Sequence, residues 1–162
     1  RTGAVPRFYA SGEYAGILGE LDGKGISVPV MDGPLGSASG LKMVYAALTK
    51  GTAALYASTL MTAKSLDLYE DLIGELEQSQ ADTLTAMNSV KTVSSKAFRW
   101  IGEMDEIAAT FGDAGTTSKI HEGASETFQQ IADSSIGHER VDSIDKNRSL
   151  EDSIAAMLKK AE

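Results

Sequence analysis

One lysine of this sequence stands where proton-transfer chemistry could take place. Lys42 follows the small-residue run Gly36-Ser37-Ala38-Ser39-Gly40-Leu41 and lies on the first turns of a long predicted helix. Oxidation of a hydroxyl to a carbonyl needs a group that takes the hydroxyl proton as hydride leaves. A lysine in a partly dry cleft, or near a cofactor cation, can have its pKa lowered enough for that role. A lysine on the first turns of a helix is more often a solvent-exposed residue, so the residue types alone leave both interpretations open.

Other residue types argue against several alternative chemistries. The chain has no cysteine, which excludes disulfides, a thiol nucleophile and thiolate metal sites. His121 and His138 lie in different segments without an H-E-x-x-H spacing, so we expect no metal site. His121 stands beside Glu122 on a predicted helix, which favours a surface pair. No G-x-S-x-G motif is present to support a serine hydrolase.

Three acids gather in one predicted helix. Glu103, Asp105 and Glu106 would repel a carboxylate substrate unless they face solvent, and they could equally be a solubilising helix face. The single tryptophan, Trp100, precedes them and could pack in the core or wall a substrate cleft. Large aromatic residues in helical domains are usually core residues, so we expect this of Phe98, Phe111 and Phe128.

The elements that must position these residues begin with a β-α-β pattern. Residues 7–12 predict a short strand, residues 13–21 a helix, and residues 26–31 a second, β-branched strand, with Gly23 and Gly25 between helix and strand. The pattern is typical of the closing unit of a parallel sheet. Because two strands cannot bury the faces of a sheet, this segment implies further strands elsewhere.

From residue 37 onward the pattern is helical. Apolar and small residues recur at steps of three and four, which predicts one helix over residues 37–65, about 45 Å long; they are Leu41, Tyr45, Leu48, Thr52, Leu55 and Thr59. So long a helix usually connects two bodies or runs through a bundle, and we expect part of its apolar stripe to remain available for a partner.

Shorter helices follow, with signals at their ends. We expect helices over residues 69–80, 82–97, 98–114, 117–132 and 149–160. Gly115 is placed to end one of them, and Ser149 with Asp152 predicts an N-cap. Residues 134–148 are polar and predict a surface loop.

Composition and charge argue against some classes of binding partner. The net charge is −8 and no basic run opposes it, so nucleic acid and anionic membranes are not expected partners. The chain lacks a stretch of about eighteen apolar residues, and it opens with Arg1 and Thr2 instead of an apolar leader. We therefore expect a soluble, cytoplasmic protein with one domain and an appendage.

Three stretches of the sequence carry a family resemblance. They are residues 7–12, residues 33–51 with their glycine, small-residue and lysine pattern, and residues 99–108, Arg-Trp-Ile-Gly-Glu-Met-Asp-Glu-Ile-Ala. Together they resemble the β-hydroxyacid dehydrogenases, the superfamily of 3-hydroxyisobutyrate and 6-phosphogluconate dehydrogenases. The branch that the sequence resembles most has a C-terminal domain of unknown function.

The resemblance implies a two-domain architecture of which this chain holds the helical part. Residues 1–33 would be the end of a Rossmann-like NAD(P)-binding domain, and residues 34–162 an all-α substrate and dimerisation domain. The fingerprint G-x-G-x-x-G after a first strand is absent, because Gly23 and Gly25 lie between a helix and a strand. NAD or NADP would then be bound mainly by residues outside this chain, which by itself would be inactive.

The resemblance also assigns site residues. Lys42 matches the acid/base lysine, Gly36 and Ser37 would lie near the cofactor, and the candidates for substrate contact are Tyr45, Thr49, Trp100, Glu103 and Asp105. Tyr45 and Thr49 could equally be packing residues of a helix seam. Two positions depart from the family pattern. Ala46 stands where better-studied relatives have a substrate-binding asparagine, and Asp105 stands where they have a lysine, which puts substrates such as 3-hydroxyisobutyrate in doubt.

Two functions from different classes remain open. The chain could be the substrate half of an NAD(P)-dependent oxidoreductase that acts on a hydroxy acid or a related alcohol or carbonyl compound. It could instead be a non-enzymatic helical module for dimerisation or partner binding. The two are compatible in part, because the resemblance implies a homodimer through the helical domain.

Overall fold

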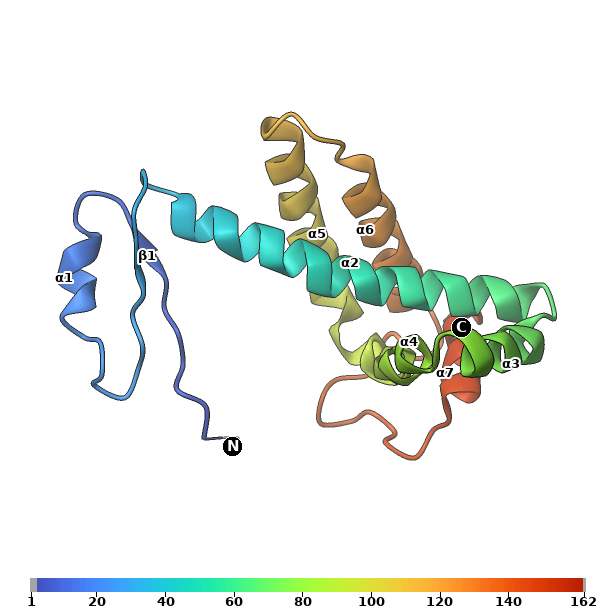
Figure 1. Ribbon diagram of the computed structural model, residues 1–162. Coiled ribbons are helices and arrows are strands. Elements are labelled where there is room, and N and C mark those ends of the chain that lie inside the picture. The colour runs from blue at the N-terminus through green and yellow to red at the C-terminus, as the bar shows by residue number, and fades with distance from the viewer. Residues whose placement is uncertain (1–2, 162) are drawn as a thin grey trace. The chain divides into compact units, whose positions relative to one another are not determined.

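The computed structural model describes residues 3–161, which are mainly helical with one two-stranded sheet. The chain divides into two compact units, one ending at Tyr45 and the other beginning at Ala46. This division falls inside α2 (Ser37–Ser65), a helix that starts in the first unit and continues in the second (Figure 1). The predicted mainly-α fold is confirmed, as are the bounds of the long helix.

The first unit contains the predicted β-α-β pattern. β1 (Ala10–Ser11) and β2 (Val30–Met31) pair in parallel, with α1 (Ala15–Gly19) between them in the chain. A further bridge between Arg7 and Ser27 continues the pairing towards the N-terminus. The buried core of this unit is small and consists of Ala10, Ala15 and Val28. Apolar side chains of α1 therefore remain in solvent, with Ile17 64% and Leu18 52% exposed.

The second unit is built around the C-terminal part of α2. Its buried face is made mostly of alanines, and Ala57 and Leu60 have no exposed surface. Small side chains allow other helices to approach closely, which explains why the buried stripe has so little bulk. The apolar residues that define the predicted stripe lie on the other side, where Leu48 is 70% and Leu55 is 64% exposed.

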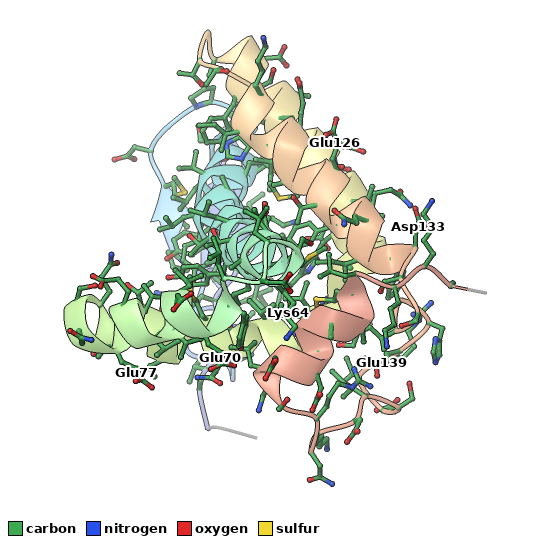
Figure 2. The ribbon with its side chains drawn as sticks, turned by 90° about the vertical axis from the view of Figure 1, so that its right-hand side faces the viewer. Lys64, Glu70, Glu77, Glu126, Asp133 and Glu139 are labelled. Atoms are coloured by element: carbon green, nitrogen blue, oxygen red, sulfur yellow. The ribbon has the colours of Figure 1, made fainter. Side chains whose placement is uncertain are left out.

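Six further elements complete this unit (Figure 2). They are α3 (Tyr69–Ser79), α4 (Ala81–Met87), the short 3₁₀ helix η1 (Asn88–Thr92), α5 (Ser94–Asp113), α6 (Lys119–Ala132) and α7 (Leu150–Met157). Their largest fully buried side chains, together with Leu60, are Phe128, Met104, Ile107, Ile131, Ile154 and Met157. The core thus draws on α2, α5, α6 and α7.

The predicted helix boundary at residues 97 and 98 is wrong. α5 is continuous from Ser94 to Asp113, and the interruption lies earlier, at η1. Val90 and Val93 are almost fully buried there, so the tight turn is held by packing that local sequence signals do not reveal. Phe98 is then not a core residue, because it is 45% exposed and carries the Arg140 guanidinium 4.1 Å from its ring centroid.

α5 and α6 form a helical hairpin whose turn follows the predicted signal. Gly115 has a φ of +78°, its N–H donates to Gly112 O at 2.9 Å, and the N–H of Thr116 donates to Phe111 O at 3.0 Å. These two bonds make a Schellman motif, in which glycine supplies the left-handed residue. The predicted N-cap at Ser149 is also confirmed, since its side chain accepts from the Asp152 N–H at 3.0 Å.

His121 is buried in the α5–α6 hairpin, which corrects the expected surface pair. Its ring packs edge-on against Phe111 with centroids 4.2 Å apart. Among the described residues its Nδ1 atom has no hydrogen-bond partner. Burial lowers the pKa of the imidazole below its ordinary value, because the charged form would lose its hydration.

The stability of the chain should consequently fall in mildly acidic solution. Histidine in the unfolded chain takes up a proton near pH 6.5, whereas folded His121 takes it up only at lower pH. Between these two pH values the unfolded state binds more protons, so lowering the pH favours unfolding. Thermal unfolding followed by circular dichroism from about pH 7.5 to 5 should show this slope. His121→Gln should flatten it and His138→Gln, at an exposed histidine, should not; equal slopes in both variants would contradict the assignment.

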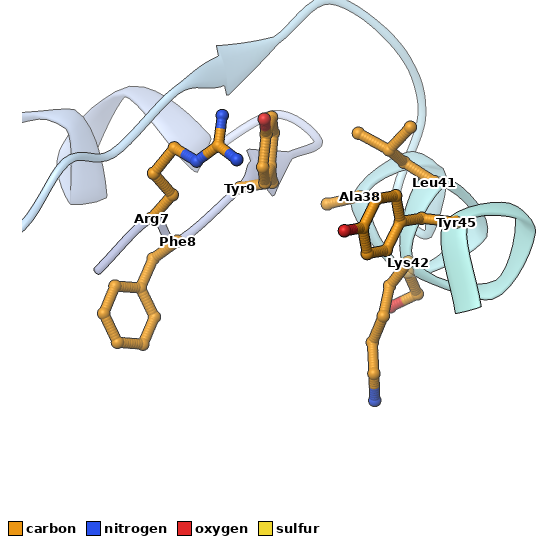
Figure 3. A pocket seen from close by; sticks show the side chains of 8 residues that line it. Arg7, Phe8, Tyr9, Ala38, Leu41, Lys42 and Tyr45 are labelled. Carbon is orange, nitrogen blue, oxygen red and sulfur yellow. The ribbon is translucent and has the colours of Figure 1, made fainter. Parts of the chain in front are cut away.

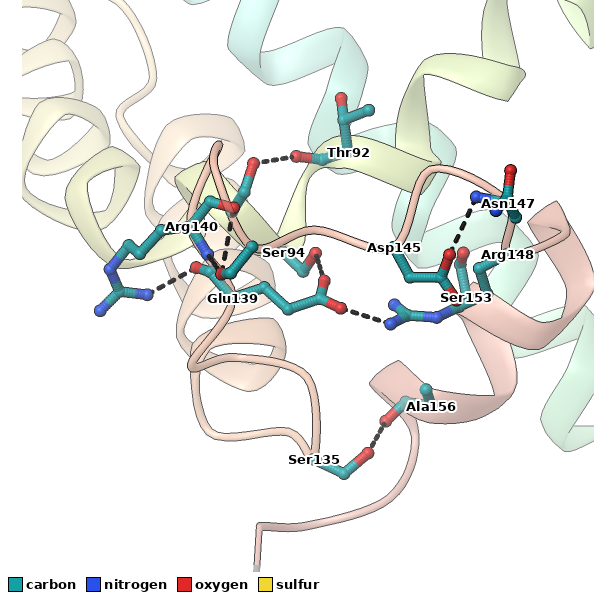
Figure 4. Close-up of polar contacts among 12 residues, drawn as sticks. Thr92, Ser94, Ser135, Glu139, Arg140, Asp145, Asn147, Arg148, Ser153 and Ala156 are labelled. Carbon is teal, nitrogen blue, oxygen red and sulfur yellow. Dashed lines mark hydrogen bonds and ion pairs between the residues drawn. The ribbon is translucent and has the colours of Figure 1, made fainter.

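The segment predicted as a surface loop, residues 134–148, holds buried polar groups (Figure 4). Glu139 is only 4% exposed and forms an ion pair with Arg148, while the Ser94 hydroxyl donates to its carboxylate at 2.6 Å. Burial raises the pKa of this carboxyl, but the hydrogen bonds from Arg148 and Ser94 outweigh it and hold the pKa below the usual value. The Glu139 side chain therefore connects the loop to the start of α5 and to the last residue of the loop, Arg148, which directly precedes the N-cap of α7.

Candidate functional site

The turn before α2 fixes where the catalytic candidate lies. Gly33 has a φ of +144°, and a Cβ at this position would lie 2.7 Å from the Ser37 hydroxyl oxygen, so only glycine fits. The Ser37 hydroxyl donates to Pro34 O at 3.0 Å, and the Ala38 N–H donates to the Ser11 hydroxyl at 3.0 Å. The bond to Pro34 links the first turn of α2 to the preceding turn, and the bond to Ser11 attaches it to the end of β1.

Lys42 lines a cavity of about 590 Å³ within the first unit (Figure 3). One wall comes from the segment that leads into β1 and the other from the first turns of α2. The lining residues are Arg7, Phe8, Tyr9, Ala38, Ser39, Leu41, Lys42 and Tyr45. The structure thus brings together two of the sequence-predicted site residues, Lys42 and Tyr45.

The opposite wall of this cavity was missed by sequence reasoning. Arg7 and Tyr9 are two residues apart on an extended segment, so their side chains lie on the same side, and the Arg7 guanidinium carbon is 6.0 Å from the Tyr9 ring centroid. The sequence offered a signal in the polar and aromatic character of residues 7–9, where a buried strand would be apolar. All three side chains are exposed.

Gly36 and Ser37, the cofactor candidates, differ in what they can offer. Gly36 lines a second cavity of about 530 Å³, together with Ser11, Gly12 and Ser39 among others, and there is open space where its Cβ would be. Ser37 uses both its hydroxyl and its N–H on Pro34 O. A ligand could therefore approach the backbone closely at Gly36, while the donors of Ser37 are already committed.

The remaining candidate residues belong to the second unit. Thr49 donates from its hydroxyl to Ala46 O at 3.3 Å, within its own helix. Trp100 is partly buried and packs edge-on against the buried Phe128, with ring centroids 5.1 Å apart, so it lies at the edge of the helical core. Glu103 forms an ion pair with Lys50 at 2.6 Å, whereas Asp105 is exposed. Of these two acids, one is thus neutralised by a lysine and the other faces solvent.

The described residues hold neither a metal-binding cluster nor a membrane-spanning helix. Within residues 3–161, no group of three or more histidine, aspartate or glutamate side chains is arranged to hold a metal ion. None of the helices in that range combines the length and apolar content needed to cross a membrane.

Comparisons with known proteins agree with this architecture. The family model "Domain of unknown function (DUF1932)" matches residues 63–131. A conserved hypothetical protein from Sinorhizobium meliloti 1021 superposes with a TM-score of 0.72 at 20% identity, over 94% of this chain and 51% of that protein. Conserved protein MTH1747, whose function is unknown and whose structure is described as similar to 3-hydroxyacid dehydrogenases, superposes with a TM-score of 0.64 at 28% identity, over 82% of this chain and 52% of its own.

These likenesses decide the fold. The chain has a β-hydroxyacid-dehydrogenase-like C-terminal helical domain. It spans about half the length of each of these two solved proteins. No curated protein matches it. The predicted resemblance is confirmed at the level of the domain.

Proposed function

We propose that this β-hydroxyacid-dehydrogenase-like chain is the substrate-binding and catalytic half of an NAD(P)-dependent oxidoreductase. Its substrate would be a hydroxy acid or a related alcohol or carbonyl compound. The observation that carries the proposal is the position of Lys42, on the first turns of α2 at the wall of a cavity large enough for a small molecule. The similarity of MTH1747 to 3-hydroxyacid dehydrogenases supports the reaction class.

Lys42 is the proton donor and acceptor in this proposal. Its side chain is exposed to the cavity and, among residues 3–161, it takes part in none of the three ion pairs. Its Nζ atom would accept the hydroxyl proton of a bound alcohol, and would return that proton to the oxygen in the reverse direction. Tyr45, one turn along α2 and in the same cavity, would help to position the substrate.

The cofactor would be held mainly by a Rossmann-like domain, of which residues 1–33 form the end. In this chain Gly36 fits a cofactor-contacting role, since a cofactor could approach its backbone closely. Ser37 would lie next to the cofactor but has its hydroxyl proton already committed to Pro34 O. Bound nicotinamide would accept or supply the hydride. The exposed apolar side chains of α1, together with the two-stranded sheet, support additional strands and helices around this unit.

The chain alone should not bind dinucleotide, because the phosphate-binding fingerprint is absent from its sequence. Titration calorimetry of residues 1–162 with NADH and NADPH should show no binding at micromolar concentrations, while the complete protein should bind one of the two. Micromolar binding by the chain alone would contradict the proposed division of labour.

An interaction module without catalysis is the second candidate, and the exposed stripe of α2 favours it. Val44, Leu48 and Leu55 are 57%, 70% and 64% exposed, at spacings that place them on one side of the helix. We propose that a second copy of the chain covers this stripe, which is compatible with either function.

Dimerisation can be measured directly. Sedimentation velocity at tens of micromolar should show a dimer, because contiguous exposed apolar surface favours association. Replacing Leu48 and Leu55 with lysine should give a monomer, whereas Leu66→Lys, at a leucine that is 61% exposed beyond the end of α2, should leave the dimer intact. A native chain that sediments only as a monomer would count against the interface.

A further inference from the structure

The cavity beside Lys42 has an unusual charge for this chain. The sequence has 23 acidic residues against 15 lysines and arginines, yet the described residues that line the cavity include Arg7 and Lys42 and no acid. These two cations come from segments 35 residues apart in the sequence. A cavity with two positive groups and no negative group in an acidic protein has the electrostatic character of an anion site.

Both cations are unpaired within the part of the chain that the structure describes. Lys50, Lys64 and Arg148 each form an ion pair with a glutamate, whereas Arg7 and Lys42 form none of those pairs. A guanidinium that faces an aqueous cavity without a carboxylate of its own keeps its donors available for a ligand.

Arg7 is held in place by the backbone on either side of it. The Ser27 N–H donates to Pro6 O at 2.8 Å, and the Phe8 N–H donates to Ser27 O at 2.8 Å. The Tyr9 ring lies beside the guanidinium, at 6.0 Å from ring centroid to the guanidinium carbon. Because the backbone is fixed on both sides, little backbone entropy is lost when the guanidinium binds a ligand.

Apart from Ser39, the rest of the cavity lining is aromatic and apolar. Phe8, Tyr9 and Tyr45 are 57%, 42% and 67% exposed, and all three line the cavity with Leu41. Figure 3 shows Arg7, Phe8 and Tyr9 on one side and Leu41, Lys42 and Tyr45 on the other. An apolar group that covers exposed rings removes their surface from water, which lowers the free energy of the complex.

We propose that Arg7 binds the carboxylate of the substrate and that the aromatic walls bind an apolar, ring-sized body. The inference rests on the proposed function, in which Lys42 serves the hydroxyl or carbonyl group, and it adds a substrate class: a hydroxy or oxo acid with a bulky apolar side chain. It also accounts for the acid at position 105, because the cation that recognises the carboxylate lies on the β1 side of the cavity.

Ligand titrations of the 162-residue chain test the substrate class without turnover or cofactor. The probes are benzoate, acetate, benzyl alcohol and inorganic phosphate, and binding is followed by NMR shifts of the amides of residues 7–9 and 38–45. Benzoate should bind about tenfold more tightly than acetate or benzyl alcohol, since it alone satisfies both the guanidinium and the rings. Equal binding of benzoate and benzyl alcohol, or tighter binding of phosphate than of benzoate, would overturn the proposal.

Three variants locate the anion. Arg7→Gln should weaken benzoate binding about tenfold, and Arg7→Lys should retain part of it, because a point charge replaces the planar fork. Lys146→Gln, at an exposed lysine in the second unit, should bind benzoate as the native chain does. If Lys42→Met loses benzoate binding while Arg7→Gln binds benzoate as the native chain does, Lys42 holds the carboxylate and the role given to Arg7 is refuted.

Turnover of the complete protein separates this inference from the proposed function. With an aromatic hydroxy acid as substrate, Arg7→Gln should raise KM about tenfold and change kcat little, because the carboxylate contact exists in ground and transition states alike. If the complete protein has no dehydrogenase activity while benzoate binding depends on Arg7, the function fails and the anion site stands. If turnover occurs and KM does not respond to Arg7, the anion site fails and the function stands.

Discussion

Lys42→Met is expected to lower kcat of the complete protein by about 10²- to 10⁴-fold, or roughly 3–5 kcal/mol of barrier. The variant removes the amine that accepts the hydroxyl proton in the proposed reaction. Cofactor affinity should remain near that of the native protein, because the dinucleotide would lie mainly on the other domain. Steady-state kinetics on a hydroxy-acid substrate, together with fluorescence titration of NAD(P)H, would measure both quantities.

The choice of control variant follows from the structure. Lys119 is exposed in the first turn of α6, with its side chain in none of the ion pairs of residues 3–161. Lys119→Met therefore removes the same charge from a similar helical position without touching the cavity, and it should leave kcat unchanged. Near-native turnover in Lys42→Met would transfer the proton-transfer role to another residue, with Tyr45 the first to test.

Lys50→Met is a second comparison for Lys42→Met, but this substitution also removes an ion pair. Lys50 is eight residues after Lys42, close to the same helix face, but its side chain is only 15% exposed and pairs with Glu103. The variant should cost far less in kcat than Lys42→Met, and its main effect should be on stability. A larger loss of turnover in Lys50→Met than in Lys42→Met would contradict the catalytic role of Lys42.

The long helix could be predicted from sequence because its signals are local. A steady spacing of apolar residues, small residues at its start and no internal proline sufficed to place it at residues 37–65. The Schellman turn at Gly115 and the cap at Ser149 were predictable for the same reason. Each depends on a few neighbouring residues whose backbone preferences are intrinsic.

Features set by packing between distant segments could not be predicted in this way. Phe98 has the composition of a core residue, but its ring is covered by Arg140, which is 42 residues later. Gly137 reads as a flexible loop residue, yet a Cβ there would lie 1.9 Å from the Ala132 carbonyl oxygen. His121 has a polar neighbour in sequence but lies against Phe111 across a helical hairpin.

The candidate site shows the same division. Lys42 could be named because it matches a family motif, and Tyr45 because it lies one helical turn further along, beside the position where the family has an asparagine. Arg7 could not, because only the pairing of residues 7–11 with residues 27–31 brings it to the same cavity. Charge complementarity inside a cavity is a property of the folded chain, and the sequence carries no spacing that reveals it.

Glu139→Ala is expected to cost about 3 kcal/mol in the free energy of unfolding, the largest stability effect that we predict. The carboxylate is 6% exposed, and Arg148, its partner, is 17% exposed. Without it, the guanidinium remains largely buried and uncompensated. The Nη1 atom of Arg148 already lacks a hydrogen-bond partner among the described residues, and the buried Ser94 hydroxyl would lose its acceptor as well. Urea denaturation at neutral pH would give the difference, with Glu126→Ala, at an exposed acid on α6, as the control.

The same pair can be tested by pH and by a compensating double variant. Because the pKa of Glu139 is lowered in the folded chain, its contribution is complete above the unfolded value of about 4.3 and is lost as pH falls through the folded pKa. The gap between native chain and Glu139→Ala should therefore close in acid. Replacing both partners, as Glu139→Leu with Arg148→Met, should recover most of the loss, since burying two uncharged side chains avoids the desolvation of an unpaired charge. If Glu139→Ala unfolds at the same urea concentration as Glu126→Ala, the pair contributes no net stability, and the loop of residues 134–148 must be held by its other contacts, among them the packing of Ile136, Arg140 over the Phe98 ring and the Ser135 hydroxyl on Ala156 O.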